Sequence, residues 1–499
     1  MSQQDVAEIS LDPIDWEAFA RVAHEALDAA IASLKTVGER PPWRPLTDAA
    51  RDEIREPVPR RPTDLAEVFD QFRRSILPFP TGNAHPRFWG WVMGNGTAEG
   101  MVADMLASAM NPHVAGYDQS APLVEHQVIA WLAELMGYPQ EASGILVSGG
   151  TAANLHGLAV ARRATAGFDV RQEGLVADGH PRLRAYGSDE THSWAKKSCE
   201  LLGLGRRGFR RIASDPQGRV EIAPLSEAIQ QDRARGERPF CVIATAGTVD
   251  TGAIDDLEAL ADLCAEEGLW LHVDGAFGAL AALAPALRPR LKGMERADSI
   301  AFDLHKWGFL QYEVGCTLVR DPQAHRATFE TSADYLTPAG RGILPDALHF
   351  PDHGLQLSRG FRALKVWMSF KTHGVDRIGR VIEQNVAQAR YLADRVTAEP
   401  RLELLAPVPL NVVCFRYVDE RLDARALDDL NREILLRVQE QGVAIPSSTR
   451  RNGRFAIRLA ITNHRSRRAD FDALADAVLK LGAAILAEPG RPQTAGRSR

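Results

Sequence analysis

The chain has 499 residues, of which 45% are hydrophobic, so it is long enough to bury a core larger than that of one small domain. A formal net charge of −6 gives no basic field for nucleic acid, and no stretch of about 18 residues is both free of charges and continuously apolar, which argues against a membrane span. The five cysteines are scattered without a CxxC pair, as expected of reduced thiols in a cytoplasm rather than of a metal site. We therefore expect a cytoplasmic protein without a nucleic-acid, membrane or metal partner.

Residues 1–84 predict an N-terminal helical arm. They begin with the amphipathic pattern WEAFARVAHEALDAAIASL and then pass through PPWRP, EPVPRRP and PFPTGNAHP, where prolines interrupt any long helix. A segment this short and this broken cannot form a core of its own, so its helices are expected to lie on another surface.

Short β-type runs alternate with helical ones from about residue 85 to 375, which predicts βαβ units and an α/β domain with a mostly parallel sheet. Between two of the runs, DDLEALADLCAEEG opens with acids and closes with a glycine, as a helix does. Right-handed crossovers would place helices on both faces of the sheet and ligands at the carboxyl ends of its strands. The β-type runs are SGILV (143–147), RAYGS (184–188), FCVIATA (240–246), LWLHVD (269–274), SIAFDL (299–304) and GCTLV (315–319).

The remainder of the chain predicts a smaller α+β domain over residues 376–487. A long helical pattern, IGRVIEQNVAQARYLADRV, precedes strand-like LNVVCFRYV, a further helix and RFAIRLAITN. The tail 488–499, EPGRPQTAGRSR, has the composition of a disordered segment.

The stretch SGILVSGGTAANL predicts a strand, a turn containing Gly149 and Gly150, and a helix that opens at Thr151. Glycines let a backbone approach a ligand closely, and the free N–H groups of a helix start favour a phosphate. Because short glycine motifs are common, an ordinary structural turn remains an open alternative at this point.

Asp274 ends the run LWLHVD, on a strand that is otherwise apolar. It could cap the next turn, as an isolated aspartate commonly does, or it could keep a nearby nitrogen base protonated from a site of low dielectric constant. His272 lies on the same face of this strand, so an HxD metal pair is conceivable, although no third ligand is evident.

Lys306 follows an apolar strand in the stretch FDLHKWG. Its stem could pack between the neighbouring aromatic rings, yet a partly desolvated amine at this place is also a nucleophile toward an aldehyde. A phosphate cradle, an acid at a strand end and a buried lysine are together the parts of a pyridoxal 5'-phosphate site. They would supply phosphate binding, a partner for the pyridinium nitrogen and a Schiff base.

Two further segments carry candidate chemistry. In GSDETHSWAKKS, Ser188 or Asp189 is expected to cap a helix whose first turn contains His192, either a hydrogen-bonded core histidine or a ring stacked on the cofactor. Residues 322–355 show no sustained period, which predicts a lid or a disordered loop. Tyr335 lies in the middle of that segment, where its phenol could deliver a proton if the loop closes.

These motifs resemble those of the group II pyridoxal phosphate-dependent amino acid decarboxylases, the family of aromatic L-amino acid, histidine and glutamate decarboxylases. The resemblance extends from about His85 into the C-terminal domain, and the combination of HVDxA and HKW at this spacing is highly specific. It implies the type I fold of pyridoxal phosphate-dependent transferases and a lyase that releases carbon dioxide from an L-amino acid. It also implies a homodimer with the active site at the interface and the N-terminal arm wrapped around the partner. The matching stretches are HPRFWGW, MVADMLASAMNP, SGGT, SDETHSW, ATAGTVDTGAIDD, HVDGAFG and HKW.

The resemblance also implies roles for single residues. Lys306 would form the Schiff base, Asp274 would pair with the pyridine nitrogen, and Tyr335 would reprotonate the substrate carbon after carbon dioxide leaves. The other implied assignments are His192 stacked on the ring with Ala276 on its opposite face, Gly150, Thr151 and His305 at the phosphate, and Thr248 near the ring.

The motifs leave the substrate open, and an aromatic or imidazole side chain is expected. The segment FWGWVMGN, which carries Trp91, and the position of His113 differ from those of aromatic-specific relatives. Trp91 and His113 are therefore the candidates for substrate contact. Trp89, Trp91 and Met93 would share one face of an extended segment, so they could equally belong to a core.

Other outcomes on the same scaffold remain open. An aldehyde synthase lets oxygen intercept the reaction, but such relatives alter the positions of Tyr335 or His192, which this chain retains. An aminotransferase or a carbon–carbon lyase is a further alternative, and Arg359 and Arg362 are candidates for the carboxylate clamp of an aminotransferase. A cofactor-binding protein with an assembly role is disfavoured by the intact set around Lys306.

Overall fold

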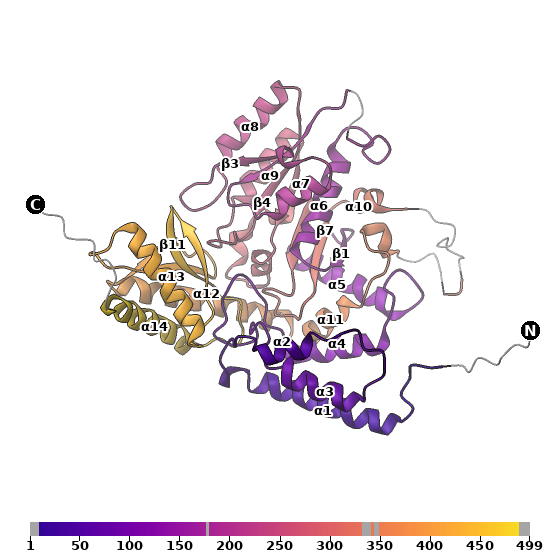
Figure 1. Ribbon diagram of the computed structural model, residues 1–499. Helices are drawn as coiled ribbons and strands as arrows, with labels where there is room; N and C mark the ends of the chain where they lie inside the picture. The colour runs from indigo at the N-terminus through magenta and orange to yellow at the C-terminus, as the bar shows by residue number, and fades with distance from the viewer. Residues whose placement is uncertain (1–8, 176–178, 332–340, 344–348, 489–499) are drawn as a thin grey trace, which may run out of the picture.

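The computed structural model describes residues 9–175, 179–331, 341–343 and 349–488. Figure 1 shows a large sheet surrounded by helices, a smaller sheet with its own helices toward the C-terminus, and a group of N-terminal helices below the large sheet. Within the described ranges, no helix combines the length and the apolar run that a membrane crossing requires.

The large sheet has seven strands and is mostly parallel, as predicted. The strands are β1 (Ser143–Val147), β2 (Leu183–Ser188), β3 (Phe209–Ile212), β4 (Arg238–Thr245), β5 (Trp270–Asp274), β6 (Ser299–Asp303) and β7 (Gly315–Val319). Their order in space is β1-β7-β6-β5-β4-β2-β3, with β7 antiparallel to both of its neighbours. All six predicted runs are strands. The prediction lacks β3, an edge strand whose sequence FRRI resembles a charged surface segment because its two arginines lie outside the core.

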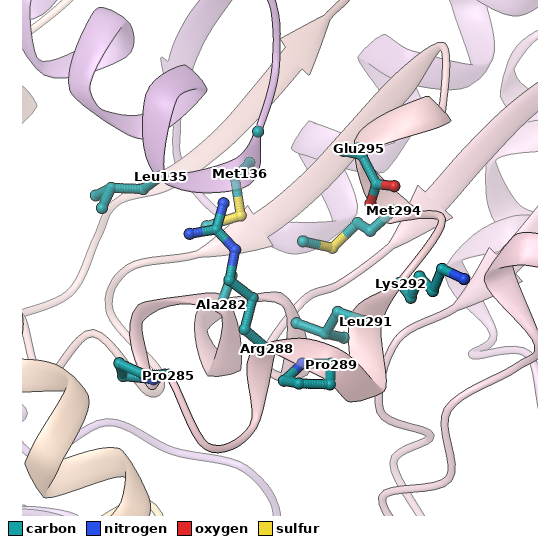
Figure 2. Close-up of a pocket in the computed structure, with 11 residues that line it drawn as sticks. Leu135, Met136, Ala282, Pro285, Arg288, Pro289, Leu291, Lys292, Met294 and Glu295 are labelled. Atoms are coloured by element: carbon teal, nitrogen blue, oxygen red, sulfur yellow. The ribbon is translucent and has the colours of Figure 1, made fainter.

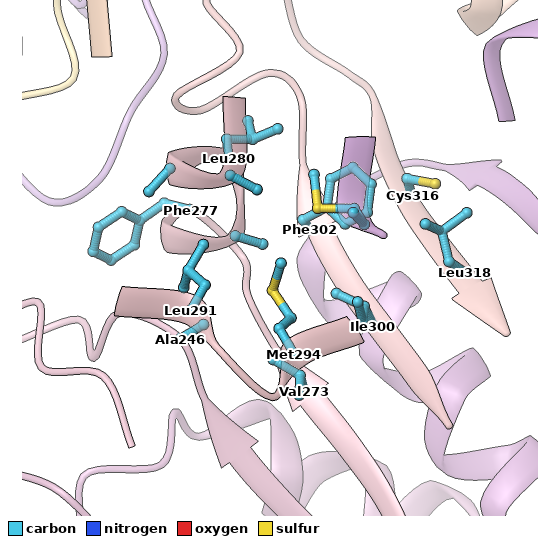
Figure 3. Packing of buried hydrophobic residues seen from close by; sticks show 14 of the residues in the cluster. Ala246, Val273, Phe277, Leu280, Leu291, Met294, Ile300, Phe302, Cys316 and Leu318 are labelled. Atoms are coloured by element: carbon cyan, nitrogen blue, oxygen red, sulfur yellow. The ribbon is translucent and has the colours of Figure 1, made fainter. Parts of the chain in front are cut away.

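Helices cover both faces of this sheet because its central strands are apolar on both sides. The helices are α5 (Ser120–Met136), α6 (Gly150–Thr165), α7 (Trp194–Leu201), α8 (Ile222–Ala234) and α9 (Leu257–Glu267). Alternate residues of β4 divide between two cores: Val242 and Ala244 pack with α8 and α9, whereas Cys241 and Ile243 pack with α6 and α7. Figure 3 shows the first core where β6 and β7 meet the 3-10 helix η3 (Gly278–Leu283).

The predicted helix of residues 255–268 is α9. The side chain of Asp256 caps its start by accepting from the N–H of Ala259, and Gly268 ends it in the left-handed conformation at φ 64°. Local signals at both ends therefore sufficed to place this helix.

The prediction that residues 322–355 lack regular structure is wrong at both ends of the segment. Asp321 caps a helix, α10 (Pro322–Phe329), and the proline occupies a first-turn position that needs no N–H donor. A 3-10 helix, η7 (Phe350–His353), closes the segment. Tyr335 lies outside the described residues.

The N-terminal helices expose much apolar surface. They are α1 (Trp16–Lys35), α2 (Asp48–Ile54), α3 (Leu65–Ser75) and α4 (Ala98–Met110), and Figure 1 shows α1, α3 and α4 lying near one another below the large sheet. No residue of α1 is buried, although Trp16 and Phe19 lie on it. α4 packs on α11 (Arg362–His373) yet leaves Leu106 and Met110 exposed.

The smaller sheet is antiparallel and has helices on its outer side. Its elements are α12 (Val375–Ala398), β8 (Leu402–Leu404), β9 (Val412–Tyr417), α13 (Ala424–Glu440), β10 (Ser447–Arg451), β11 (Arg454–Ala460) and α14 (Arg468–Ala487). The strand order is β10-β11-β9-β8. The core of this part includes Trp89 from far earlier in the chain, whose ring stacks on Phe471 with 4.7 Å between centroids.

Candidate active site

A cavity of about 660 Å³ opens where β1 and β6 end and α6 begins. Because β1 and β6 are both antiparallel to β7, their carboxyl ends meet at one edge of the sheet, where α/β folds bind ligands. Five residues that the sequence assigned to the cofactor or the substrate line it: Trp91, Gly150, Thr151, His305 and Lys306. The other lining residues are Val92, Met93, Ser148, Gly149, Ala152, Asp303, Tyr312 and Glu313.

The turn between β1 and α6 has the form of an anion cradle. α6 begins at Gly150, one residue earlier than predicted, and no side chain caps its first N–H groups. A Cβ atom at Gly150 would lie 2.8 Å from Oδ2 of Asp303, and one at Gly149 would lie 3.1 Å from Cε1 of His305, so larger residues would crowd the cavity. The free N–H groups and the helix dipole at this place favour a phosphate.

Lys306 extends its amine into the cavity and pairs with a buried acid. Its Nζ lies 2.8 Å from Oδ2 of Asp303, whose side chain is almost wholly buried and whose Oδ1 has no hydrogen-bond partner in the structure. The sequence prediction does not include Asp303. The signal was present, because Asp303 ends an apolar strand three residues before Lys306, just as Asp274 ends β5.

His305 forms the wall beside the cradle. Its Nδ1 accepts from the N–H of Val314 at 3.2 Å, so the neutral ring carries its proton on Nε2, 3.8 Å from Oδ2 of Asp303. Burial lowers the pKa of His305, which favours this neutral form. The ring is held against Tyr312 with 4.4 Å between centroids. His305 therefore presents one N–H donor at the edge of the cradle.

Three donors fix the carboxylate of Asp274 at the end of β5. Oδ2 accepts from Nε1 of Trp194 at 2.5 Å, and Oδ1 accepts from Nδ2 of Asn154 at 3.2 Å and from the N–H of Ala276 at 3.1 Å. Asn154 lies on α6 and also donates to the carbonyl of Gly150 at 2.8 Å, which connects the acid to the cradle. The sequence prediction includes neither Trp194 nor Asn154, because contacts across about a hundred positions leave no periodic signal.

His272 belongs to the core and does not form a metal pair with Asp274. Its Nδ1 lies 2.7 Å from Oγ of Ser299, and its Nε2 lies 2.8 Å from Oδ1 of Asn154, so both ring nitrogens have partners. Nowhere in the described residues do three or more His, Cys, Asp or Glu side chains gather in a way that could hold a metal ion. Burial lowers the pKa of His272 to about 4, and the neutral ring orients Asn154 toward Asp274.

Acid should destabilise the protein through His272. An unfolded imidazole has a pKa near 6.5 and this folded one has a pKa of about 4, so the unfolded state binds more protons between these values. At about 1.4 kcal/mol per pKa unit, His272 removes roughly 3 kcal/mol from the free energy of unfolding as the pH falls through this window. Above pH 6.5, the contribution of His272 to the free energy of unfolding is constant. Urea unfolding across a pH series measures this slope.

A pair of variants isolates that contribution. His272→Asn should reduce the slope between pH 6.5 and about 4, to which the buried His85 and His464 also contribute, whereas His126→Asn, at an exposed position of α5, should leave it unchanged. Identical slopes in the native protein and in His272→Asn would contradict the account.

His192 lies outside the wall of the cavity. Its side chain is exposed, and its Nδ1 accepts from the N–H of Trp194 at 3.3 Å. The prediction that Ser188 or Asp189 caps this helix is wrong, because Ser193 is the N-cap residue of α7 and His192 precedes the helix. Trp194, two residues later, provides its connection to Asp274.

Thr248 and His113 also lie away from the cavity lining. Thr248 is buried in the turn after β4, where its Oγ1 accepts from the N–H of Ala253 at 3.0 Å and lies 3.0 Å from Oγ1 of Thr251. The ring of His113 lies 5.5 Å from that of Tyr117, and its Nδ1 is buried without a partner in the structure. The cavity within one chain therefore includes Trp91 but not His113.

Trp91 interrupts the segment that was expected to be extended. Its φ of 53° is left-handed, and its side chain is 56% exposed at the cavity, whereas Trp89 is buried in the smaller domain's core. The prediction that Trp89, Trp91 and Met93 share one face is therefore wrong.

The two arginines considered as a carboxylate clamp have acidic partners within the chain. The guanidinium of Arg359 is fully buried against Glu125 and donates to the carbonyl of Leu146 at 2.8 Å. Arg362 pairs with Glu313 at 2.9 Å. Arg359 is thus occupied in the core, and Arg362 reaches the rim of the cavity only through its partner.

A second cavity, of about 440 Å³, lies at the end of α5, away from all the predicted site residues. Figure 2 shows its mostly apolar lining, with Arg288 reaching toward Met136. Its charged lining residues are Arg288, Lys292 and Glu295, and none of them belongs to the candidate motifs of the sequence, so the active-site assignment rests on the first cavity.

The family model described as "Pyridoxal-dependent decarboxylase conserved domain" matches residues 48–418. The chain belongs to this family. The decarboxylase is 34% identical over 454 residues to the aromatic-L-amino-acid decarboxylase of Bacillus atrophaeus, covering 90% of this chain and 92% of the relative. It is 27% identical over 459 residues to the phenylacetaldehyde synthase of Arabidopsis thaliana, covering 90% and 93% of the two chains.

The fold of the decarboxylase also matches solved structures. Oryza sativa TDC, solved with PLP and tryptamine, superposes with a TM-score of 0.88 at 28% identity, covering 95% of this chain and all of that one. The predicted α/β fold of the pyridoxal phosphate-dependent enzymes is thereby confirmed, as is the carboxy-lyase class.

The residues of the first cavity fit pyridoxal 5'-phosphate, the cofactor of this family. The cradle at Gly149 and Gly150 suits its phosphate, and the amine of Lys306 opens onto the same space. The buried Oδ1 of Asp303, without a partner, shows that the polar groups here are not satisfied by one another alone. An arrangement of this kind needs a polar ligand.

Proposed function

We propose that this decarboxylase converts an aromatic L-amino acid to the corresponding amine and carbon dioxide. The observation that carries the proposal is the convergence on one cavity of the Lys306 amine, the uncapped start of α6 and the wall made by Trp91. The name of the Bacillus atrophaeus relative, an aromatic-L-amino-acid decarboxylase, supports the choice of substrate class.

Each predicted residue has a proposed role around the cofactor. When bound, pyridoxal 5'-phosphate supplies an electron sink for the bond that releases carbon dioxide. Lys306 would hold the cofactor covalently, and Asp274 would keep its ring nitrogen protonated. Gly150, Thr151 and His305 would hold the phosphate, and Tyr335 would return a proton to the substrate carbon. His192 would stack on the ring opposite Ala276, with Thr248 near the ring.

The wall of the cavity suits an apolar, planar side chain. Trp91, Val92, Met93 and Tyr312 all line the cavity together with Lys306. An aromatic ring between such groups gains contact area and about 0.5–1.5 kcal/mol from favourable ring geometry. His113 would reach a substrate only from a partner subunit, since it does not line the cavity of its own chain.

The test is the release of carbon dioxide from each of the twenty L-amino acids and from L-dihydroxyphenylalanine, with the amine measured alongside. We expect one equivalent of amine per carbon dioxide and a preference for aromatic substrates. Carbon dioxide from acidic or small aliphatic substrates alone would overturn the assignment of the substrate class.

Aldehyde synthesis is the second candidate, because the chain also resembles a phenylacetaldehyde synthase. In that outcome, ammonia and hydrogen peroxide accompany carbon dioxide and an aldehyde replaces the amine. The presence of both Tyr335 and His192 favours the simple decarboxylation.

An aminotransferase or a carbon–carbon lyase is less well supported. The carboxylate clamp would need a free guanidinium, yet Arg359 and Arg362 are paired with Glu125 and Glu313. A keto acid formed without carbon dioxide would indicate such an activity.

We further propose a homodimer in which the arm, residues 1–84, covers a second copy of the chain. Support comes from α1, which has no buried residue, and from exposed apolar side chains on α3 and α4. In each subunit, residues 85–375 would form the large domain and residues 376–487 the small domain. These exposed side chains include Trp16, Phe19, Leu65, Val68, Phe72, Met105, Leu106 and Met110.

A charge placed on this surface should separate the subunits. Leu106→Glu should weaken the dimer at least a hundredfold, about 3 kcal/mol, because an unpaired carboxylate would be buried at the interface. Leu436→Glu on α13 is the matched control, since both leucines are 43% exposed. Sedimentation equilibrium measures both variants, and equal dissociation constants would refute this interface.

We also propose a cytoplasmic location. All five cysteines are free and buried in the structure, which suits a reducing compartment.

A further inference from the structure

The segment that carries Trp91 is bound to the smaller domain by Ile445, by Ala460 at the end of β11 and by Thr462. The N–H of Trp89 donates to the carbonyl of Ile445 at 2.9 Å, and the carbonyl of Trp89 accepts from the N–H of Ala460 at 2.9 Å. Farther on, Oγ1 of Thr462 donates to the carbonyl of Met93 at 2.9 Å. The smaller domain therefore holds one wall of the active-site cavity.

Arg458 of β11 completes this row of contacts from the interior of the protein. It is 3% exposed, and its Nη1 donates to the carbonyl of Trp91 at 2.9 Å and to Oγ of Ser447 at 3.1 Å. Its Nη2 donates to the carbonyl of Val249. Arg458 forms no ion pair with an acid in the described chain, and burial lowers its pKa. Asp250 favours the charge without pairing with it, so the buried guanidinium depends mainly on its hydrogen bonds to the carbonyls of Trp91 and Val249.

The backbone of Trp91 is strained where Arg458 binds it. Its φ of 53° lies in the left-handed region, which residues other than glycine rarely adopt. The hydrogen bond from Arg458 holds the carbonyl in this conformation, and the conformation directs the exposed indole to the cavity. Without that bond, Trp91 is free to relax to an ordinary conformation and to move its ring away.

The second carbonyl belongs to the turn that follows β4. Val249 is next to Thr248, and Asp250 of the same turn accepts from Oγ1 of Thr449 at 2.8 Å. The Sγ of Cys414 also donates to the carbonyl of Asp250 at 3.1 Å. Arg458 thus connects the wall at Trp91 to the turn containing Thr248, and neighbouring residues of the smaller sheet hold that turn in place.

We propose that Arg458 is a positioning residue for substrate selection: by holding Trp91 in its left-handed conformation, it keeps the indole in place to contact an aromatic substrate side chain. Only the kinetic consequence of this inference rests on the proposed function. Its structural content, the coupling between the guanidinium and the strained backbone, is independent of the substrate.

The kinetic test compares Arg458→Met, Trp91→Ala and the double variant, all loaded with cofactor. Arg458→Met should raise KM for L-tryptophan about tenfold, with kcat changed less than about twofold and cofactor content unchanged. Adding Trp91→Ala to it should cause no further loss, because both changes remove the same contact. Arg416→Met removes another buried arginine of the same sheet, one paired with Glu403, and should leave KM unchanged. A fall in kcat alone, or losses that add in the double variant, would overturn the proposal.

A stability test does not depend on any substrate. Trp91→Gly and Trp91→Ala both remove the indole, but only glycine accepts the left-handed conformation without strain. With Arg458 present, Trp91→Gly should therefore unfold about 1–2 °C above Trp91→Ala. In the Arg458→Met background, the advantage of glycine should disappear.

The two tests separate the two claims. A glycine advantage that persists equally without Arg458 would refute the positioning role. If instead this advantage depends on Arg458 but no aromatic amino acid yields carbon dioxide, the substrate assignment fails and the positioning role stands.

Discussion

Lys306→Ala is expected to lower carbon dioxide release by at least roughly a thousandfold, a loss of about 4 kcal/mol in transition-state stabilisation. The amine of Lys306 is the nucleophile that opens onto the cavity, and Asp303 holds it at 2.8 Å. Alanine would remove the proposed covalent attachment for the cofactor. Manometry or coupled detection of carbon dioxide with L-tryptophan measures the change.

The matched control is Lys292→Ala, which removes an exposed lysine paired with Glu258 at 2.8 Å. It should retain native activity, because its ammonium lies on the surface near η4 (Arg288–Leu291) and not at the cavity of Lys306. If Lys306→Ala kept more than about a tenth of the native rate, a different amine would have to carry the chemistry.

Asp274→Asn is expected to lower activity by roughly a hundredfold, or about 3 kcal/mol. Trp194 and Ala276 donate to different oxygens of Asp274, so an asparagine, with its single acceptor oxygen, keeps only one of these two hydrogen bonds. It has no negative charge, and a ring nitrogen facing it would lose the partner that keeps it protonated. Carbon dioxide release and the absorbance spectrum of the bound cofactor measure the two consequences separately.

Trp194→Phe tests the role of the hydrogen bond that orients the carboxylate of Asp274. It removes the donor at 2.5 Å but leaves the charge of Asp274, so its loss of activity should be smaller than that of Asp274→Asn. The reverse order would indicate that the orientation of this carboxylate matters more than its charge.

Much of the fold follows from local sequence. Six of the seven strands of the large sheet coincide with the predicted β-type runs, most of which are apolar, as is typical of strands buried on both faces. α9 is bounded by an aspartate and a glycine that act within a few residues. Lys306 and Asp274 could be singled out because a polar residue at the end of an apolar strand departs from a regular pattern.

Contacts between distant segments account for what the sequence did not reveal. Trp194 contacts Asp274 and Arg458 contacts Trp91, although 80 and 367 positions separate the members of these pairs in the sequence. The left-handed φ of Trp91 could not be predicted from the local sequence for the same reason, since the hydrogen bond to its carbonyl comes from the smaller domain. α10 escaped prediction because eight residues are too few for a clear helical period.

Borohydride reduction of the cofactor-loaded protein, followed by proteolysis and mass spectrometry, tests the central claim most directly. Reduction should fix the mass of the cofactor on the peptide that contains Lys306 and on no other. Fixation on another lysine, or a cofactor that remains fully removable after reduction, would contradict the proposed active site.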